Sequence, residues 1–112
     1  VWQACLAEMD AVSLAGHFHN TYGMAIANIY QSLEQGIRVF DSSIAGLGGC
    51  PYAKGASGNV STEDLYYLLS NMGYDTGIDL DALMIASQNI SQVLQRTNPS
   101  NYANAYWQKR CA

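Results

Sequence analysis

Charged side chains are scarce in this chain of 112 residues. Asp, Glu, Lys and Arg make up 12% of it, about half of the roughly 25% that is usual in soluble domains. Few residues are therefore suited to open solvent, and we expect other protein to cover much of the surface. The hydrophobic share of 49% is otherwise that of a globular protein, and the length suffices for one small domain.

Three further features are missing, and each absence excludes a class of protein. The net charge is −4 and the five basic residues are scattered, which argues against nucleic-acid binding because that role requires a basic face. No apolar run reaches the about 20 residues that cross a bilayer, so we expect no membrane span. The first residues lack the basic region and apolar core of a signal peptide.

Cysteine is too sparse for a disulfide framework. Cys5, Cys50 and Cys111 are odd in number and widely separated in the sequence. Free thiols fit a reducing compartment. We therefore expect a cytoplasmic location of the bacterial type, with the mitochondrial matrix as the alternative for a eukaryotic source.

Apolar spacing predicts two strands and three helices. The predicted order is a strand at 12–18, a helix from about 21 to 36, a strand at 37–42, a helix at 61–73 and a helix at about 79–96. The pattern Ser61-Thr62-Glu63-Asp64 is typical of a capping box, and Gly36 is placed to end the first helix. We divide the chain into an N-terminal segment at 1–11, an α/β portion at 12–96 and a tail at 97–112 without assigned structure.

This order favours the α/β class. A helix between two buried strands implies a parallel pair covered on both faces. Two such strands do not make a stable sheet by themselves. The chain therefore has the pattern of a piece of a larger assembly, such as a (β/α)8 barrel of about 250 residues, whose chemistry lies at the C-terminal ends of its strands.

His17 and His19 stand two residues apart at the end of the first predicted strand. Strand side chains alternate between faces, so both imidazoles should point to the same side and indicate a metal site. Imidazole suits zinc, manganese or iron, whereas oxygen-rich completion favours magnesium or manganese. Binding requires neutral imidazole, so activity should fall at acid pH. Ordinary core or surface histidines are the alternative interpretation.

A long loop follows the second predicted strand, and loops of this length are usually functional or disordered. Gly46, Gly48 and Gly49 precede Cys50 in it. No Gly-Lys-Ser/Thr follows, so a phosphate loop is a weak interpretation, and a lid or a close approach to a ligand is a better one. Cys50 could donate a proton or act as a nucleophile, could join the two histidines at a tetrahedral zinc, or could be an ordinary buried residue.

Three polar residues near the loop have both a structural and a functional interpretation. Asn59 is either a turn residue or the amide oxygen that completes the metal site. We interpret Asp41, at the end of the second predicted strand, as structural. Glu63 is interpreted in the same way, because an acidic residue stabilises a helix start.

Two segments, LAGHFHNTYG and SIAGLGGCPYAKGASGN, resemble the 3-hydroxy-3-methylglutaryl-CoA lyase family. These enzymes are metal-dependent lyases built on a (β/α)8 TIM barrel, and Ser43 to Tyr52 is similar to the family's signature. The likeness extends from about Leu14 to Arg96. It implies that the chain is the C-terminal βαβα portion of the barrel plus an additional C-terminal helix.

The resemblance also implies a reaction, a retro-Claisen cleavage of 3-hydroxy-3-methylglutaryl-CoA to acetyl-CoA and acetoacetate. By likeness, His17, His19 and Asn59 hold a divalent cation, Mg²⁺ or Mn²⁺. His17 also assists proton transfer, and Cys50 is the catalytic cysteine of the loop.

Two departures limit the likeness. Asn20 stands where the lyases usually have Asp, although related synthases have Asn there. The family's Asp-Arg pair, which supplies a further metal ligand and an activating arginine, would lie in a missing N-terminal barrel portion. We therefore expect this chain to be inactive alone. Alternatives are a non-catalytic barrel-fragment module that binds a complementary chain or forms a homo-oligomer, and a related acyl-CoA aldolase or synthase.

Overall fold

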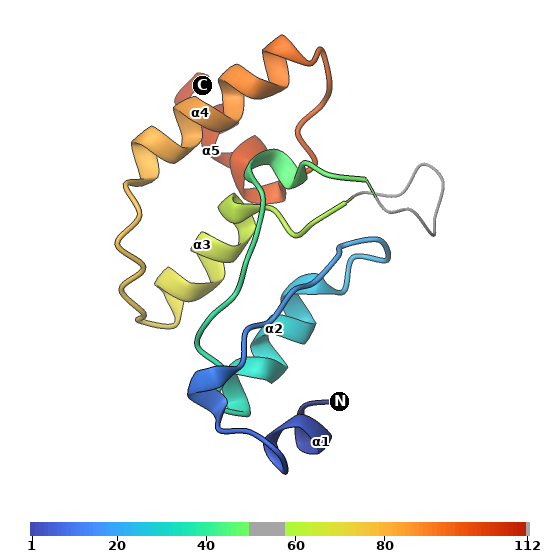
Figure 1. The fold of residues 1–112 in the computed structure, drawn as a ribbon. Helices are drawn as coiled ribbons and strands as arrows, with labels where there is room; N and C mark the ends of the chain where they lie inside the picture. The colour runs from blue at the N-terminus through green and yellow to red at the C-terminus, as the bar shows by residue number, and fades with distance from the viewer. Residues whose placement is uncertain (50–57, 112) are drawn as a thin grey trace.

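The computed structural model describes residues 1–49 and 58–111, and helices dominate them. The α-helices are α1 (Trp2–Leu6), α2 (Ala25–Glu34), α3 (Thr62–Asn71), α4 (Leu80–Val93) and α5 (Asn101–Cys111), with 3₁₀ turns η1 (Ala11–Ser13) and η2 (Ile44–Gly46). Figure 1 shows α4 and α5 together at one end of the molecule, α1 and α2 at the other, and α3 between them. No helix in the described ranges is long and apolar enough to cross a bilayer.

The predicted helix at 61–73 is confirmed as α3 and the predicted helix at about 79–96 as α4. The Ser61 side chain accepts a hydrogen bond from the Asp64 backbone N–H at the start of α3. Asp79 caps α4 in the same way by accepting from the Ala82 N–H. Each cap satisfies an N–H group that has no partner within the helix, and the cap at Ser61 is the one that the sequence pattern predicts.

Helix α2 begins later than the sequence predicts, at Ala25 instead of about residue 21. Gly23 adopts a φ of +73°, and its N–H donates to the carbonyl of Asn20. This turn delays the helix because a left-handed residue cannot lie within it. The Asn20 side chain still accepts from the Ala25 N–H, and Gly36, at a φ of +93°, follows the end of α2 as predicted.

The two predicted strands appear only as isolated bridges in the described residues. Part of the predicted strand at 12–18 is the turn η1, and Gly16 makes one parallel bridge to Phe40. Among the residues that the structure describes, this bridge does not continue into a ladder. Two parallel strands do not form a stable sheet without further strands and covering layers. The βαβα layout stays a prediction.

The tail at 97–112, left without assigned structure, contains helix α5. Its first turn is bonded to a residue far away in the sequence. Asp64 of α3 accepts hydrogen bonds from the Ser100 hydroxyl and the Tyr102 N–H. The Ser100 hydroxyl in turn accepts from the Ala103 N–H. The helix therefore depends on a contact between residues 36 or more positions apart, which local spacing does not reveal.

Two apolar clusters hold the described residues together. The first joins α2 to α3 and the bridged segments, and its buried members are Ala25, Ile29, Leu33, Val60 and Leu65. The second joins α4 to α5 through Met84, Ala103 and Tyr106. The first cluster therefore lies beside the predicted site, whereas the second belongs to the C-terminal helices.

Candidate metal site at the bridged segments

Three segments far apart in the sequence meet through their backbones. Gly16 forms a parallel bridge with Phe40, Ser43 forms one with Ser61, and His19 forms an antiparallel bridge with Asn59. The segments that carry the histidine pair, Asp41 and Asn59 are thus brought side by side. This meeting is what the barrel resemblance predicts for residues at the ends of neighbouring strands.

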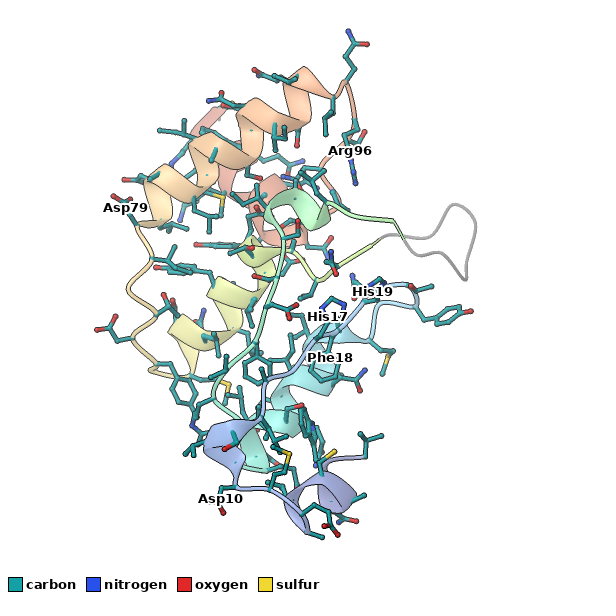
Figure 2. All side chains as sticks on the ribbon, viewed as in Figure 1. Asp10, His17, Phe18, His19, Asp79 and Arg96 are labelled. Atoms are coloured by element: carbon teal, nitrogen blue, oxygen red, sulfur yellow. The ribbon has the colours of Figure 1, made fainter. Side chains whose placement is uncertain are left out.

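The alternation of side chains along 16–19 places both histidines on one face. Phe18 packs against the first apolar cluster, so the residues on either side of it point away from the core. The ring centroids of His17 and His19 lie 5.1 Å apart, and Figure 2 shows the two labelled side chains next to each other. The predicted convergence of the two imidazoles is present.

The His19–Asn59 pair brings a third predicted residue to this face. The hydrogen bonds beside the pair run from the Val60 N–H to the Phe18 carbonyl and from the Asn20 N–H to the Gly58 carbonyl. His19 and Asn59 are therefore a non-hydrogen-bonded pair, the type in which opposite side chains come closest and share one face. The imidazole and the amide can then serve one ligand.

The Asn59 amide has one end fixed and one end open. Its Nδ2 donates to the Leu47 carbonyl at 3.0 Å. Its Oδ1 is buried and, among the described residues, has no hydrogen-bond partner. A buried oxygen without a partner costs free energy, and ligation of a cation is one way in which that cost is recovered.

Glycines allow the loop to pass this close to Asn59. A Cβ at Gly48 would lie 2.6 Å from the Asn59 Nδ2, and Gly48 has a φ of +108°. A Cβ at Gly58 would overlap the carbonyl oxygen of Gly48. Gly46 also has a positive φ, of +62°. Close backbone approach explains these positions, while the predicted lid role of Gly46, Gly48 and Gly49 stays a prediction.

Asp41 is a candidate that sequence reasoning assigned to structure alone. Its Oδ1 lies 2.6 Å from His17 Nδ1, and both side chains are more than half exposed. Histidines that bind metals usually direct their other ring nitrogen to a carboxylate, which fixes the ring. The signal in the sequence was an acid at the end of the strand next to the histidine strand.

The residues present fit a divalent cation with nitrogen and oxygen ligands. The pairing with Asp41 leaves His17 Nε2 available, His19 adds a second imidazole, and the unpartnered Asn59 Oδ1 adds an oxygen. Within 1–49 and 58–111, no group of three or more His, Cys, Asp or Glu side chains is placed to hold a metal. The described donors are therefore two imidazoles and an amide oxygen, a partial ligand set for a divalent cation.

Cys50 lies outside the described residues, so neither its catalytic role nor the zinc alternative with His17 and His19 is tested by the structure.

Known proteins similar to this chain are lyases. A hydroxymethylglutaryl-CoA lyase of Pseudomonas mevalonii is 55% identical over 100 residues, which cover 89% of this chain and 33% of that protein. A 3-hydroxy-3-isohexenylglutaryl-CoA/hydroxy-methylglutaryl-CoA lyase of Pseudomonas aeruginosa is 57% identical over 103 residues, covering 92% and 34%. A mitochondrial hydroxymethylglutaryl-CoA lyase of Arabidopsis thaliana is 56% identical over 103 residues, covering 92% and 22%.

Solved structures agree with the sequence comparisons. The crystal structure of hydroxymethylglutaryl-CoA lyase from P. aeruginosa matches with a TM-score of 0.92 at 56% identity, over 96% of this chain and 36% of that one. An HMG-CoA lyase from Acinetobacter baumannii in complex with coenzyme A and 3-methylmalate matches with a TM-score of 0.84 at 42% identity, over 93% and 34%.

The chain spans about a third of the length of these bacterial relatives, which accords with the expected missing barrel portion. The sequence profile of the HMGL-like family matches residues 2–90, and the chain belongs to that family.

Proposed function

We propose that the protein containing this chain cleaves 3-hydroxy-3-methylglutaryl-CoA to acetyl-CoA and acetoacetate, with a divalent cation held by His17, His19 and Asn59. The observation that carries the proposal is the unpartnered, buried Asn59 Oδ1 opposite His19 in a non-hydrogen-bonded pair. A turn residue would need no such open oxygen. Mg²⁺ and Mn²⁺ are the proposed cations.

The chemistry of this cleavage starts at the tertiary hydroxyl of the substrate. A cation bound there would supply Lewis-acid polarisation of the hydroxyl and carbonyl oxygens. Loss of the hydroxyl proton lets a carbonyl form as the neighbouring C–C bond breaks, and the electron pair passes to an enolate of acetyl-CoA. That enolate then takes up a proton to give acetyl-CoA.

The chain's own residues supply positioning and proton transfer in this scheme. Asp41 orients His17, so Nε2 is the one ring nitrogen left to bind a cation or accept a proton. Cys50 is proposed as the proton donor to the enolate. Its place in the family signature from Ser43 to Tyr52 supports this role, as does the general need to protonate the enolate away from bulk water.

Part of the site must come from elsewhere in the protein. The described donors leave coordination positions for oxygen ligands, and the resemblance assigns an acidic ligand and an activating arginine to the missing N-terminal barrel portion. That portion is therefore the first proposed partner, and the CoA thioester is the second.

The test is a chimaera in which this chain replaces the matching third of the P. mevalonii lyase. We expect the chimaera to release acetyl-CoA and acetoacetate in the presence of Mg²⁺ or Mn²⁺, whereas the host without its own third and this chain alone should be inactive. A chimaera that is folded by circular dichroism but cleaves no thioester would overturn the proposal.

The role of Cys50 is tested in the same chimaera with Cys50→Ser. General acid–base groups contribute about 100-fold or more, so kcat should fall by at least about that factor while the affinity for Mn²⁺ is unchanged. An unchanged kcat would remove Cys50 from the mechanism. Weaker Mn²⁺ binding would instead favour Cys50 as a metal ligand.

A further inference from the structure

Glu63 is a fully buried carboxylate that the proposed mechanism does not use. It lies in the first turn of α3 with an exposed fraction of 0%. An acid that only stabilises a helix start gains this from an exposed position, whereas burial of a charge is costly unless it is well hydrogen-bonded. Burial raises the pKa of Glu63, and hydrogen bonds from Ala45 and Ser87 oppose that rise. A role at the helix start alone therefore does not explain why Glu63 is buried.

The two carboxylate oxygens of Glu63 accept hydrogen bonds from the same backbone N–H. Oε1 and Oε2 accept from the Ala45 N–H at 2.9 and 3.2 Å. Ala45 has a φ of +55° inside η2, a left-handed conformation that is unfavourable for an alanine. The carboxylate thus stabilises a turn that alanine does not favour.

This turn leads directly to the backbone that fixes Asn59. Leu47 follows η2, and its carbonyl accepts the Asn59 Nδ2–H. A Cβ added at Gly46 would lie 3.2 Å from the Asn59 carbonyl oxygen, so the turn packs on Asn59 from a second direction. Since the amide nitrogen and oxygen are at opposite ends of one planar group, binding Nδ2 decides where Oδ1 points.

We propose that Glu63 is a positioning residue, which holds the 44–47 turn so that the Leu47 carbonyl orients Asn59 with its Oδ1 toward the cation. This inference rests on the metal site of the proposed function. It assigns to Glu63 an effect on metal affinity, although the carboxylate itself binds no metal.

The carboxylate is anchored from the C-terminal helices. The Ser87 side chain of α4 favours the charged form of Glu63 and so lowers its pKa, and Asn98 Nδ2 donates to the Ser87 oxygen at 2.6 Å. Ser87 is itself fully buried. The C-terminal part of the chain therefore reaches the site through a line of polar groups, from half-buried Asn98 through buried Ser87 and Glu63 to the Ala45 N–H.

The experiment measures the Mn²⁺ dissociation constant by calorimetry in the chimaera, with and without Glu63→Ala. Removal of groups that orient metal ligands costs 10–100-fold in affinity, and we expect a loss of about 10-fold here. Glu63→Gln keeps one oxygen that can accept from the Ala45 N–H, so its loss of affinity should be below about threefold, smaller than the 10–100-fold range. A Glu63→Gln variant as weak as Glu63→Ala would overturn the proposal, because the charge rather than the hydrogen bond would then act.

Asp64→Asn is the matched control, because Asp64 is the neighbouring acid on α3 and binds α5 instead of the turn. It should lower the melting temperature without changing the Mn²⁺ dissociation constant. Glu63→Ala with an equal drop in melting temperature and an unchanged dissociation constant would overturn the proposal. A native chimaera that binds no Mn²⁺ would instead contradict the proposed function.

Two double variants test the route through Asn59. In an Asn59→Ala background, Glu63→Ala should cause no further loss of Mn²⁺ affinity, since coupled residues are not additive. An additive loss would contradict the route. Ala45→Gly tolerates the positive φ without help, so it should restore part of the affinity, and of the folding if that is lost, in the Glu63→Ala variant. No gain in either would also overturn the proposal.

Discussion

The bridged segments and the C-terminal helices are held in opposite ways. Helices α4 and α5 share the apolar cluster of Met84, Ala103 and Tyr106, and Asp79 and Ser100 cap their first turns. At the site, three isolated bridges join three extended segments. The C-terminal helices are thus held by apolar packing, by their caps and by the bonds of α5 to Asp64 of α3, whereas the site depends on sparse backbone pairing.

Stabilising contacts and candidate ligands lie in different parts of this chain. His17 and Asp41 are more than half exposed although they pair at 2.6 Å, and exposed pairs contribute little to stability. The buried groups Ser87 and Glu63 belong to the helices and yet reach the site. The helices therefore stabilise, and the bridged segments carry the proposed ligands.

The strongest effect is expected on Mn²⁺ affinity at the proposed ligand His19. In the chimaera, His19→Ala should weaken Mn²⁺ binding by more than about 100-fold, beyond the 10–100-fold that an orienting group costs. Its melting temperature should change little, because His19 belongs to neither apolar cluster. A large fall in melting temperature with Mn²⁺ affinity retained would mean that His19 stabilises the fold and binds no metal. The bridged segments would then not differ in role from the C-terminal helices.

Met84→Ala probes the stabilising side. Met84 is fully buried between α4 and α5, so truncation should lower the free energy of unfolding by about 2–5 kcal/mol in urea titrations. Met84→Leu, which conserves volume, should cost less than about 1.5 kcal/mol. Equal costs for both variants would mean that the cluster does not hold the helices together.

Asp41→Asn tests whether the exposed His17–Asp41 pair affects Mn²⁺ affinity without affecting the free energy of unfolding. Asparagine keeps an acceptor for His17 Nδ1 but loses the negative charge, so the Mn²⁺ dissociation constant should rise by about 10-fold. The free energy of unfolding should stay within about 0.5 kcal/mol, as is usual for exposed positions. Calorimetry and urea titration measure the two quantities, and a reversed pattern would make Asp41 a structural residue.

The smallest effect concerns pH and Glu63. Its pKa in the folded chain is raised above the ordinary 4.5, mainly by burial, so the folded state binds this proton more tightly than the unfolded state does. Stability from this group is therefore fully present below about pH 4.5 and is lost as pH rises through the folded pKa. The difference in unfolding free energy between the native residue and Glu63→Gln should show this slope, and a flat difference would contradict it.

Sequence reasoning recovered the groups whose signal is local. The period of two places His17 and His19 on one face, and the capping pattern starts α3 at the correct residue. The same reasoning assigned Asp41 and Glu63 to structure, because their partners lie 24 and 18 positions away. It also left α5 unassigned, since its start is held by Asp64 of another helix.

The family, the histidine pair, the glycine-rich loop and the capped start of α3 can be read from the amino-acid sequence alone. These follow from side-chain period, backbone freedom and short-range hydrogen bonds. The folded chain was needed to show that the Asn59 oxygen stays open, that Asp41 pairs with His17 and that Glu63 is buried against the 44–47 turn. Burial and long-range pairs arise only when the chain folds. Neither can be read from the spacing of neighbouring residues along the sequence.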